Sequence, residues 1–235
     1  IRSEHGQAHT IVAANVFAHI DDLDDVLLGI KGLLAPDGAF AAEVHYLGDL
    51  VEHGGYDQIY HEHVSYFSLR PLAALLKRFG LEIFDAEFHE IHGKLLRFWA
   101  SHQGRRPATP RLTAALAGEK DLYTQGTFAA FAEGVNRHRQ AMRTLVISLK
   151  AQGRRIAGYG APAKGNILLN ACGLGRELID YVVDTTPQKQ GAFTPGTHIP
   201  VIAPEESRAA PPDYFLLLAW NYADYILEKE ATFRE

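Results

Sequence analysis

Four consecutive side chains that can bind or transfer protons lie within the first half of the chain: Tyr60, His61, Glu62 and His63. Their hydrophobic neighbours are Ile59, Val64, Tyr66 and Phe67. We expect these neighbours to carry the segment into a cleft, where the pKa of a histidine can be tuned toward neutral pH. The stretch therefore predicts acid/base chemistry.

The same stretch permits two other interpretations. His61 and His63 form an H-x-H pair whose side chains would share one face of a strand, as metal ligands can. The residues that follow, VSYFSLRP, add no carboxylate or further histidine at short spacing. We therefore favour acid/base chemistry over a metal site, while a solvated loop of histidines remains a third interpretation.

A second motif, GYGAPAK, carries the pattern G-x-G-x-x-A at Gly158, Gly160 and Ala163. It follows a predicted strand and precedes a predicted helix, where backbone N–H groups and a helix N-terminus receive phosphate. Asp184 ends the next strand, where an acceptor for a ribose hydroxyl would lie, and Lys164 suits a diphosphate better than NAD. The alternative is that the glycines only let helix and strand pack closely.

The bulk composition excludes several classes of protein. The 235 residues are 47% hydrophobic and 22% charged, with a net charge of −5 and no long basic run, so nucleic acid is not an expected partner. A single cysteine, Cys172, leaves no internal disulfide framework or Cys-rich zinc site within these residues and favours a reducing cytoplasm. Nothing resembles a signal peptide or membrane span.

The hydrophobic pattern predicts an open α/β sheet in the first part of the chain. A buried strand ends near Asn15, and His19 closes it, where such sheets bind ligands; an isolated histidine there is more often a capping or packing residue. A helix that stops at Pro-Asp-Gly, a strand, and a helix capped by Ser68 follow. Two further strands, LEIFDAEFHE and KLLRFWASH, are joined through His92 and Gly93.

The second part of the chain predicts a smaller α/β unit. We place a boundary near residue 107, two helices within 111–150, and then three parallel strands with helices. The predicted domains are 1–106, 107–150 and 151–235. No coiled-coil heptad or other interface signature appears, so the sequence leaves the oligomeric state open.

Taken together, several motifs resemble the sugar-nucleotide C-methyltransferases. They are ANVFAHI, YDQIYHEHVSYFSL, HGKLLRFWA, GYGAPAKGN, YVVDTTPQKQGAFTPGTHIPV and DYFLLLAWNYAD, and they occur in the family's order from about residue 8 to the end. The resemblance implies an S-adenosylmethionine-dependent enzyme that methylates carbon 3 of a dTDP-4-keto-deoxysugar in pathways to the branched sugars of antibiotics. Its departures from the family's H-G-G-S-L-R pattern are Lys94 and Leu95.

The resemblance also implies a domain arrangement. Members have a four-cysteine zinc domain, a Rossmann-like methyltransferase domain and a Rossmann-like nucleotide-sugar domain. Residues 1–106 would be the back half of the methyltransferase sheet, 107–150 a helical connector, and 151–235 the last domain. The zinc domain and the Gly-rich cofactor loop are absent here, so zinc is expected only in an N-terminal domain outside this chain. Because the chain starts at Ile1, we expect further N-terminal residues.

Site residues follow from the resemblance by position. His63 matches the proposed base, with Tyr60, Glu62 and His19 at other active-site positions, and Asn15 is expected near the cofactor. The nucleotide diphosphate would lie against Gly158, Tyr159, Gly160, Ala163, Lys164 and Asn166. Asp184 would meet a sugar hydroxyl of the nucleoside. Two alternatives remain: an NAD-dependent oxidoreductase and a non-catalytic nucleotide-sugar binding module.

Overall fold

The computed structural model describes residues 2–90 and 94–233. Its contacts divide the chain into two compact units, which we describe separately. The first unit comprises Ile1–Gly55 and His61–Phe131, and the second comprises Tyr56–Tyr60 and Ala132–Glu235. The division therefore splits the YHEHV stretch between Tyr60 and His61. Within the described residues, no helix is long and apolar enough to cross a membrane.

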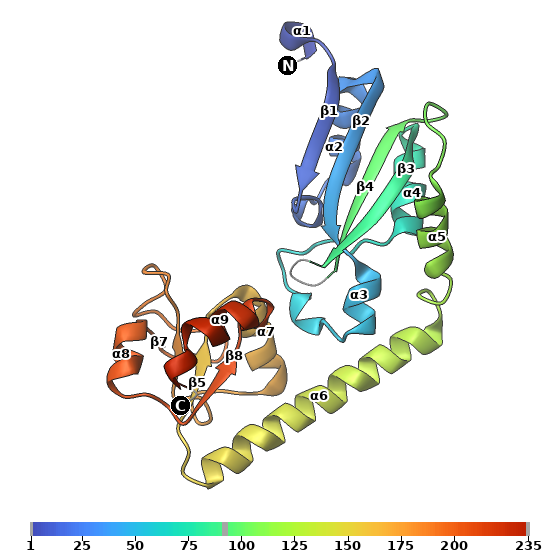
Figure 1. Ribbon diagram of the computed structural model, residues 1–235. Helices are drawn as coiled ribbons and strands as arrows, with labels where there is room; N and C mark the ends of the chain where they lie inside the picture. The colour runs from blue at the N-terminus through green and yellow to red at the C-terminus, as the bar shows by residue number, and fades with distance from the viewer. Residues whose placement is uncertain (1, 91–93, 234–235) are drawn as a thin grey trace. The chain divides into compact units, whose positions relative to one another are not determined.

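The first unit is built on a four-stranded sheet of order β1-β2-β4-β3 (Figure 1). β1 and β2 are parallel, whereas β4 runs antiparallel to both β2 and β3. This confirms the predicted α/β sheet that ends in a strand pair. The elements are α1 (Arg2–His5), β1 (Ala8–Ala14), η1 (Phe17–His19), α2 (Leu23–Leu33), β2 (Leu34–His45), α3 (Leu47–Glu52), α4 (Leu69–Arg78), β3 (Leu81–Glu90), β4 (Lys94–His102) and α5 (Pro110–Gly118).

One predicted boundary is wrong. The Pro-Asp-Gly triplet does not stop α2 but lies inside β2, which begins at Leu34. The pairing of β1 with β2 shifts register here, from Ala8 opposite Leu34 to Thr10 opposite Ala39. A strand irregularity accommodates Pro36, which has no N–H for the ladder. A Cβ at Gly38 would lie 3.0 Å from Ala8 O and 3.1 Å from Ala35 O, so the backbone leaves little room for a larger residue here.

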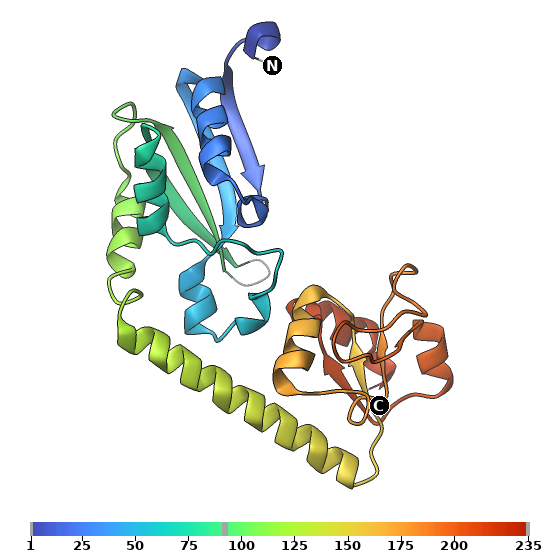
Figure 2. The ribbon, with the colours of Figure 1, turned by 180° about the vertical axis from the view of Figure 1, so that it is seen from behind.

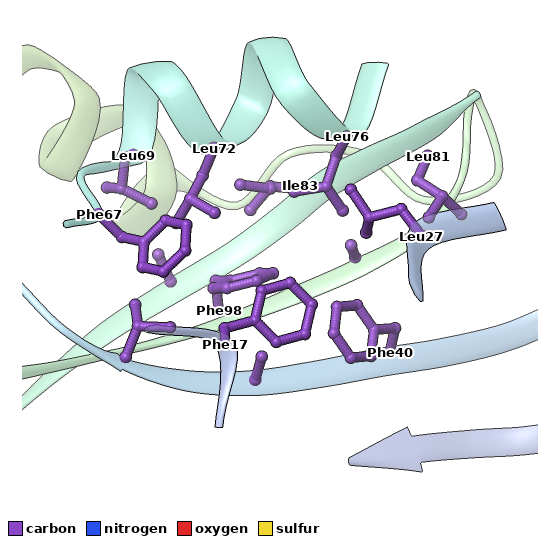
Figure 3. Close-up of a cluster of buried hydrophobic side chains, with 14 of the residues drawn as sticks. Phe17, Leu27, Phe40, Phe67, Leu69, Leu72, Leu76, Leu81, Ile83 and Phe98 are labelled. Carbon is purple, nitrogen blue, oxygen red and sulfur yellow. The ribbon is translucent and has the colours of Figure 1, made fainter. Parts of the chain in front are cut away.

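The hydrophobic core lies between this sheet and the helices α2 and α4, which cover the same face in both views (Figures 1 and 2). Figure 3 shows the α4 side chains of Leu72 and Leu76 directed toward a group of aromatic rings. In that group the Phe17 ring centroid is 5.5 Å from Phe40 and 6.2 Å from Phe67. One aromatic cluster thus joins η1, β2 and the segment that precedes α4.

The N-terminus of α4 is capped from a distant part of the chain. Ser68 occupies the N-cap position, as predicted, but its side chain makes no capping hydrogen bond. Instead the Glu119 carboxylate, only 1% exposed, accepts hydrogen bonds from Leu69 N (2.6 Å) and Arg70 N (3.0 Å). The Tyr123 hydroxyl donates to the Glu119 carboxylate and lies 2.9 Å from Ser68 Oγ. Burial, and next the hydrogen bond to Glu119, raise the pKa of Tyr123 to about 12.

The second unit contains a parallel four-stranded sheet of order β7-β6-β5-β8. The predicted strands and helices are present, and β7 is a short strand that the hydrophobic pattern missed. The elements are η2 (Tyr56–Gln58), α6 (Gln125–Ala151, which begins in the first unit), β5 (Ile156–Tyr159), α7 (Ala163–Cys172), β6 (Tyr181–Val183), β7 (Val201–Ile202), α8 (Pro204–Ala209), β8 (Tyr214–Leu217), η3 (Trp220–Tyr222), α9 (Ala223–Lys229) and η4 (Ala231–Phe233).

Replacing Glu119 tests the long-range cap. Glu119→Ala should lower the free energy of unfolding by about 3 kcal/mol, because two buried N–H groups of α4 lose a charged acceptor. Urea denaturation followed by circular dichroism measures the change. The control is Asp121→Ala, an exposed acidic residue nearby. Equal, small effects of both substitutions would show that α4 does not depend on the cap.

Candidate active site

Three histidines of the first unit form a cluster around His63. The ring centroid of His63 lies 5.1 Å from that of His19 and 5.4 Å from that of His45. Tyr66 approaches His63 edge-on at 6.3 Å. Sequence analysis assigned roles to His19 and His63 but none to His45. The signal that would have identified His45 is its position at the carboxyl end of β2, beside the end of β1.

Backbone hydrogen bonds fix the His63 segment against the ends of β1 and β2. Val64 N donates to Ala18 O at 2.8 Å, which joins the segment to the residue before His19. Leu47 N donates to Phe67 O at 2.7 Å, just after β2. His63 is therefore held between η1 and the end of β2.

Burial distinguishes the two histidines of the H-x-H pair. His63 is 7% exposed, whereas His61 and Glu62 are exposed. The segment forms a turn and not a strand, so the expectation that His61 and His63 share one face is wrong. Phe67 is buried as expected, but the side chains of Ile59 and Val64 are 46% and 47% exposed.

The cluster suits proton transfer. A neutral imidazole can take a proton from a substrate, and a neighbouring imidazole can then accept that proton. Among the described residues, no group of three or more His, Cys, Asp or Glu side chains could hold a metal ion.

Asn15 directly follows β1 and has a φ of 52°, a left-handed conformation that asparagine tolerates better than most residues. Its N–H donates to Glu43 O at 3.0 Å, which ties the turn to β2. Asn15 is exposed at the carboxyl end of a parallel strand. That is where open α/β sheets bind their ligands, so this position fits contact with a cofactor.

Residues 56–60 are grouped with the second unit, whereas the histidine cluster belongs to the first. The Tyr56 hydroxyl lies 3.1 Å from His138 Nδ1 and 3.4 Å from Cys172 Sγ, and burial raises the pKa values of both Tyr56 and Cys172. The role predicted for Tyr60 beside His63 stays a prediction.

The Gly-rich turn packs closely against the residues that follow β8. A Cβ at Gly158 would lie 2.7 Å from Leu218 Cδ1, and one at Gly160 would lie 2.8 Å from Ala219 Cβ. Gly160 also has a φ of 85°, which few other residues adopt. The turn therefore packs tightly against the end of β8, whichever ligand it binds.

Lys164 lies beside an aromatic ring. Its Nζ is 5.4 Å from the Trp220 ring centroid, and the Trp220 indole N–H donates to Asp57 Oδ2 at 2.5 Å. Burial lowers the pKa of Lys164, and the charge of Asp57 opposes that shift. Sequence analysis missed Trp220 and Asp57, which lie far from Lys164 in the chain.

The other predicted substrate-binding residues are distributed around the turn. Ala163 begins α7, and Asn166 Nδ2 donates to Pro162 O at 3.3 Å. The Tyr159 hydroxyl donates to Glu230 Oε1 and lines a cavity of about 490 Å³ beside α8. Asp184 is 8% exposed and accepts hydrogen bonds from the backbone of Ala161 and Thr186.

The HGKLLR segment falls partly outside the described residues. His92 and Gly93, predicted to join the strand pair, lie there. Lys94 begins β4 and donates its N–H to Asp49 Oδ2 at 3.0 Å. Leu95 is buried at 4% exposure.

Comparison with known proteins gives the class of this protein. Residues 90–235 match the family described as "C-methyltransferase C-terminal domain", and residues 1–86 match one described as "Methyltransferase domain". The chain therefore belongs to the C-methyltransferase family. Over 238 aligned residues it is 42% identical to the C-methyltransferase NovU of Streptomyces niveus. That alignment covers 100% of this chain and 57% of the relative's length.

A solved structure with some similarity is the N-methyltransferase NodS from Bradyrhizobium japonicum WM9. It shares 14% sequence identity, and the match covers 41% of this chain and 52% of that one, with a TM-score of 0.30. A similarity of this size supports no argument about the site.

Chemical modification tests the difference in burial between neighbouring histidines. Diethyl pyrocarbonate should modify the exposed His61 several times faster than the buried His63, because the reagent must reach a ring nitrogen. Peptide mass mapping over a time course measures both rates in one sample. In urea the two rates should become equal, and equal rates in the folded protein would contradict the described geometry.

Proposed function

We propose that this chain is part of an S-adenosylmethionine-dependent C-methyltransferase that methylates the carbon next to the ketone of a dTDP-4-keto-deoxysugar. The observation that carries the proposal is the buried His63 between His19 and His45, in a chain of the C-methyltransferase family. Transfer of a methyl group to carbon requires a base, and these rings supply one. Carbon 3 is the proposed position because the family resemblance implies methylation there; carbon 5 is the other carbon next to the ketone.

His63 acts as the general base in this proposal. It removes the proton from the carbon next to the ketone, which leaves an enolate whose carbon is nucleophilic. His19 presents an exposed ring 5.1 Å from His63, a place from which its N–H can stabilise the enolate oxygen. Each turnover replaces one C–H bond by a C–CH3 bond and releases one proton from His63.

S-adenosylmethionine, when bound, supplies the electrophilic methyl group. Of the residues in this chain, Asn15 at the end of β1 is the one proposed to contact it. Glu62, exposed next to His63, and Tyr60 are proposed to orient the sugar. Such orientation accounts for much of the acceleration when two bound molecules react.

The second unit is proposed to bind the nucleotide part of the substrate. The N–H groups of Ala163 and Lys164 lie in the first turn of α7, where a helix favours an anion. Lys164 adds a positive charge at this turn. Gly158 and Gly160 let the turn approach β8, and Asn166 lies one helical turn further along α7.

The two alternatives predict different binding. An NAD-dependent oxidoreductase would bind NADH, and a non-catalytic module would bind dTDP but not S-adenosylmethionine. The internal hydrogen bonds of Asp184 favour neither a ribose contact nor NAD. Titration with NADH, dTDP and S-adenosylmethionine distinguishes all three functions.

Incubation with both substrates tests the proposed reaction. The full-length gene product, S-adenosylmethionine and a dTDP-4-keto-6-deoxysugar should yield a sugar nucleotide heavier by one CH2 in mass spectrometry, with the new methyl on carbon by NMR. His63→Gln should lower kcat by roughly 100-fold or more, the usual contribution of a general base. Affinity for dTDP should not change.

The matched control is His61→Gln, which alters an exposed histidine two positions away. It should retain most of the turnover. Loss of dTDP binding together with turnover in His63→Gln would show that His63 is structural. No mass gain despite S-adenosylmethionine binding would mean that the acceptor sugar is wrong.

A further inference from the structure

The carboxylate of Asp184, directly after β6, is in hydrogen-bond contact with three donors of its own unit. Oδ1 accepts a hydrogen bond from Thr186 N at 2.8 Å. Oδ2 accepts one from Ala161 N at 2.7 Å and lies 3.3 Å from Lys189 Nζ. Burial alone would raise the pKa of Asp184, but the Ala161 and Thr186 N–H groups and the Lys189 charge hold it below its ordinary value. Asp184 is therefore a buried, charged acceptor.

Lys189 completes the arrangement. Besides its ion pair with Asp184, its Nζ donates to Ala161 O at 2.9 Å. Asp184 and Lys189 thus hold both the N–H and the C=O of Ala161, the residue between Gly160 and Pro162. Gly160 N donates to Val183 O at 2.7 Å, which adds a further link from the turn to β6.

These bonds limit what Asp184 can do for a ligand. A carboxylate offers about four lone-pair sites, and three donors already occupy sites on the Asp184 carboxylate. Asp184 is 8% exposed, so a ribose hydroxyl would have to displace a bond that holds the turn. Burying that turn N–H without a partner would cost more than the new contact gains.

With Ala161 held by Asp184 and Lys189, a different set of N–H donors is left for an anion. Ala161 N is occupied and Pro162 has no N–H, so the next N–H groups along the chain are those of Ala163, Lys164 and Gly165 in the first turn of α7. Pro162, at the N-cap position of α7, provides no side-chain hydrogen bond to this helix. The direction of these N–H groups depends on the backbone of Gly160 and Ala161 just before them.

We propose that Asp184 and Lys189 are positioning residues that lock the Gly160–Ala161 turn so that the first turn of α7 receives the diphosphate, and that Asp184 itself does not contact the nucleoside. This inference rests on the proposed function, since it concerns the same nucleotide-binding turn. It gives Lys189 a role that the G-x-G-x-x-A pattern does not include.

Two ligands that differ only in phosphate test the inference. In the full-length protein, Asp184→Asn and Lys189→Met should weaken dTDP binding by about tenfold in calorimetry, the effect of losing about 1.4 kcal/mol. Thymidine, which lacks both phosphates, should bind with affinity changed less than about twofold, measured by NMR titration. Lys189→Arg should restore most dTDP affinity because it keeps the charge and donor.

The chain offers a matched control at the opposite ends of the same strands. Asp180 accepts hydrogen bonds from Ile156 N at 2.9 Å and Lys150 Nζ at 3.0 Å, so it repeats the combination of carboxylate, backbone N–H and lysine. Asp180→Asn should lower stability without changing the dTDP to thymidine affinity ratio. An equal change of that ratio in both aspartate variants would overturn the inference.

The remaining outcomes also decide the question. Equal weakening of dTDP and thymidine by Asp184→Asn would show a direct nucleoside contact and overturn the inference. Hydrogen exchange without ligand tests the positioning role of Asp184 separately from the proposed function. The Ala161 amide should exchange faster in Asp184→Asn than in the wild type. If exchange is faster in Asp184→Asn but the wild type does not bind dTDP, the nucleotide function is rejected and the role of Asp184 in holding the turn stands. If exchange is unchanged, that role of Asp184 is rejected.

Discussion

Aromatic packing beneath the histidine cluster is the interaction on which the first unit's site depends. Phe17 lies in η1, two residues before His19, and Phe67 lies four residues after His63. Both rings are buried and pack near each other, with Phe40 of β2 against Phe17 (Figure 3). Removing these rings from water is worth more than any single hydrogen bond at the site. The positions of the two histidines therefore follow from the core below them.

The second unit uses polar contacts for a similar purpose. The Gly-rich turn packs against the end of β8, where a Cβ on Gly158 would clash with Leu218. On its other side, Asp184 and Lys189 hold the Ala161 peptide. The turn is thus fixed on both sides, by van der Waals contact and by charge-assisted hydrogen bonds.

Buried carboxylates recur as backbone acceptors in both units. Glu119 caps α4, which begins directly after the segment that carries His63. Asp184 holds the turn that begins α7. Neither residue would be recognised as a cap from its neighbours in sequence, because Leu69 N and Ala161 N, which donate to Glu119 and Asp184, lie more than 20 residues away from them. A charged side chain in such a place is stable only because several donors surround it.

Residue patterns alone predict the α/β class, the strand pair that closes the first sheet, the parallel second sheet and the C-methyltransferase resemblance. Hydrophobic periodicity and the order of motifs carry that information locally. The sequence did not determine that Pro36 lies inside β2, that His61 and His63 differ in burial, or that His45 joins His19 and His63. It also did not reveal the bond of Lys189 to the turn. Tertiary structure decided these features, because each depends on contacts between segments that are distant in the chain, and a local pattern does not encode such contacts.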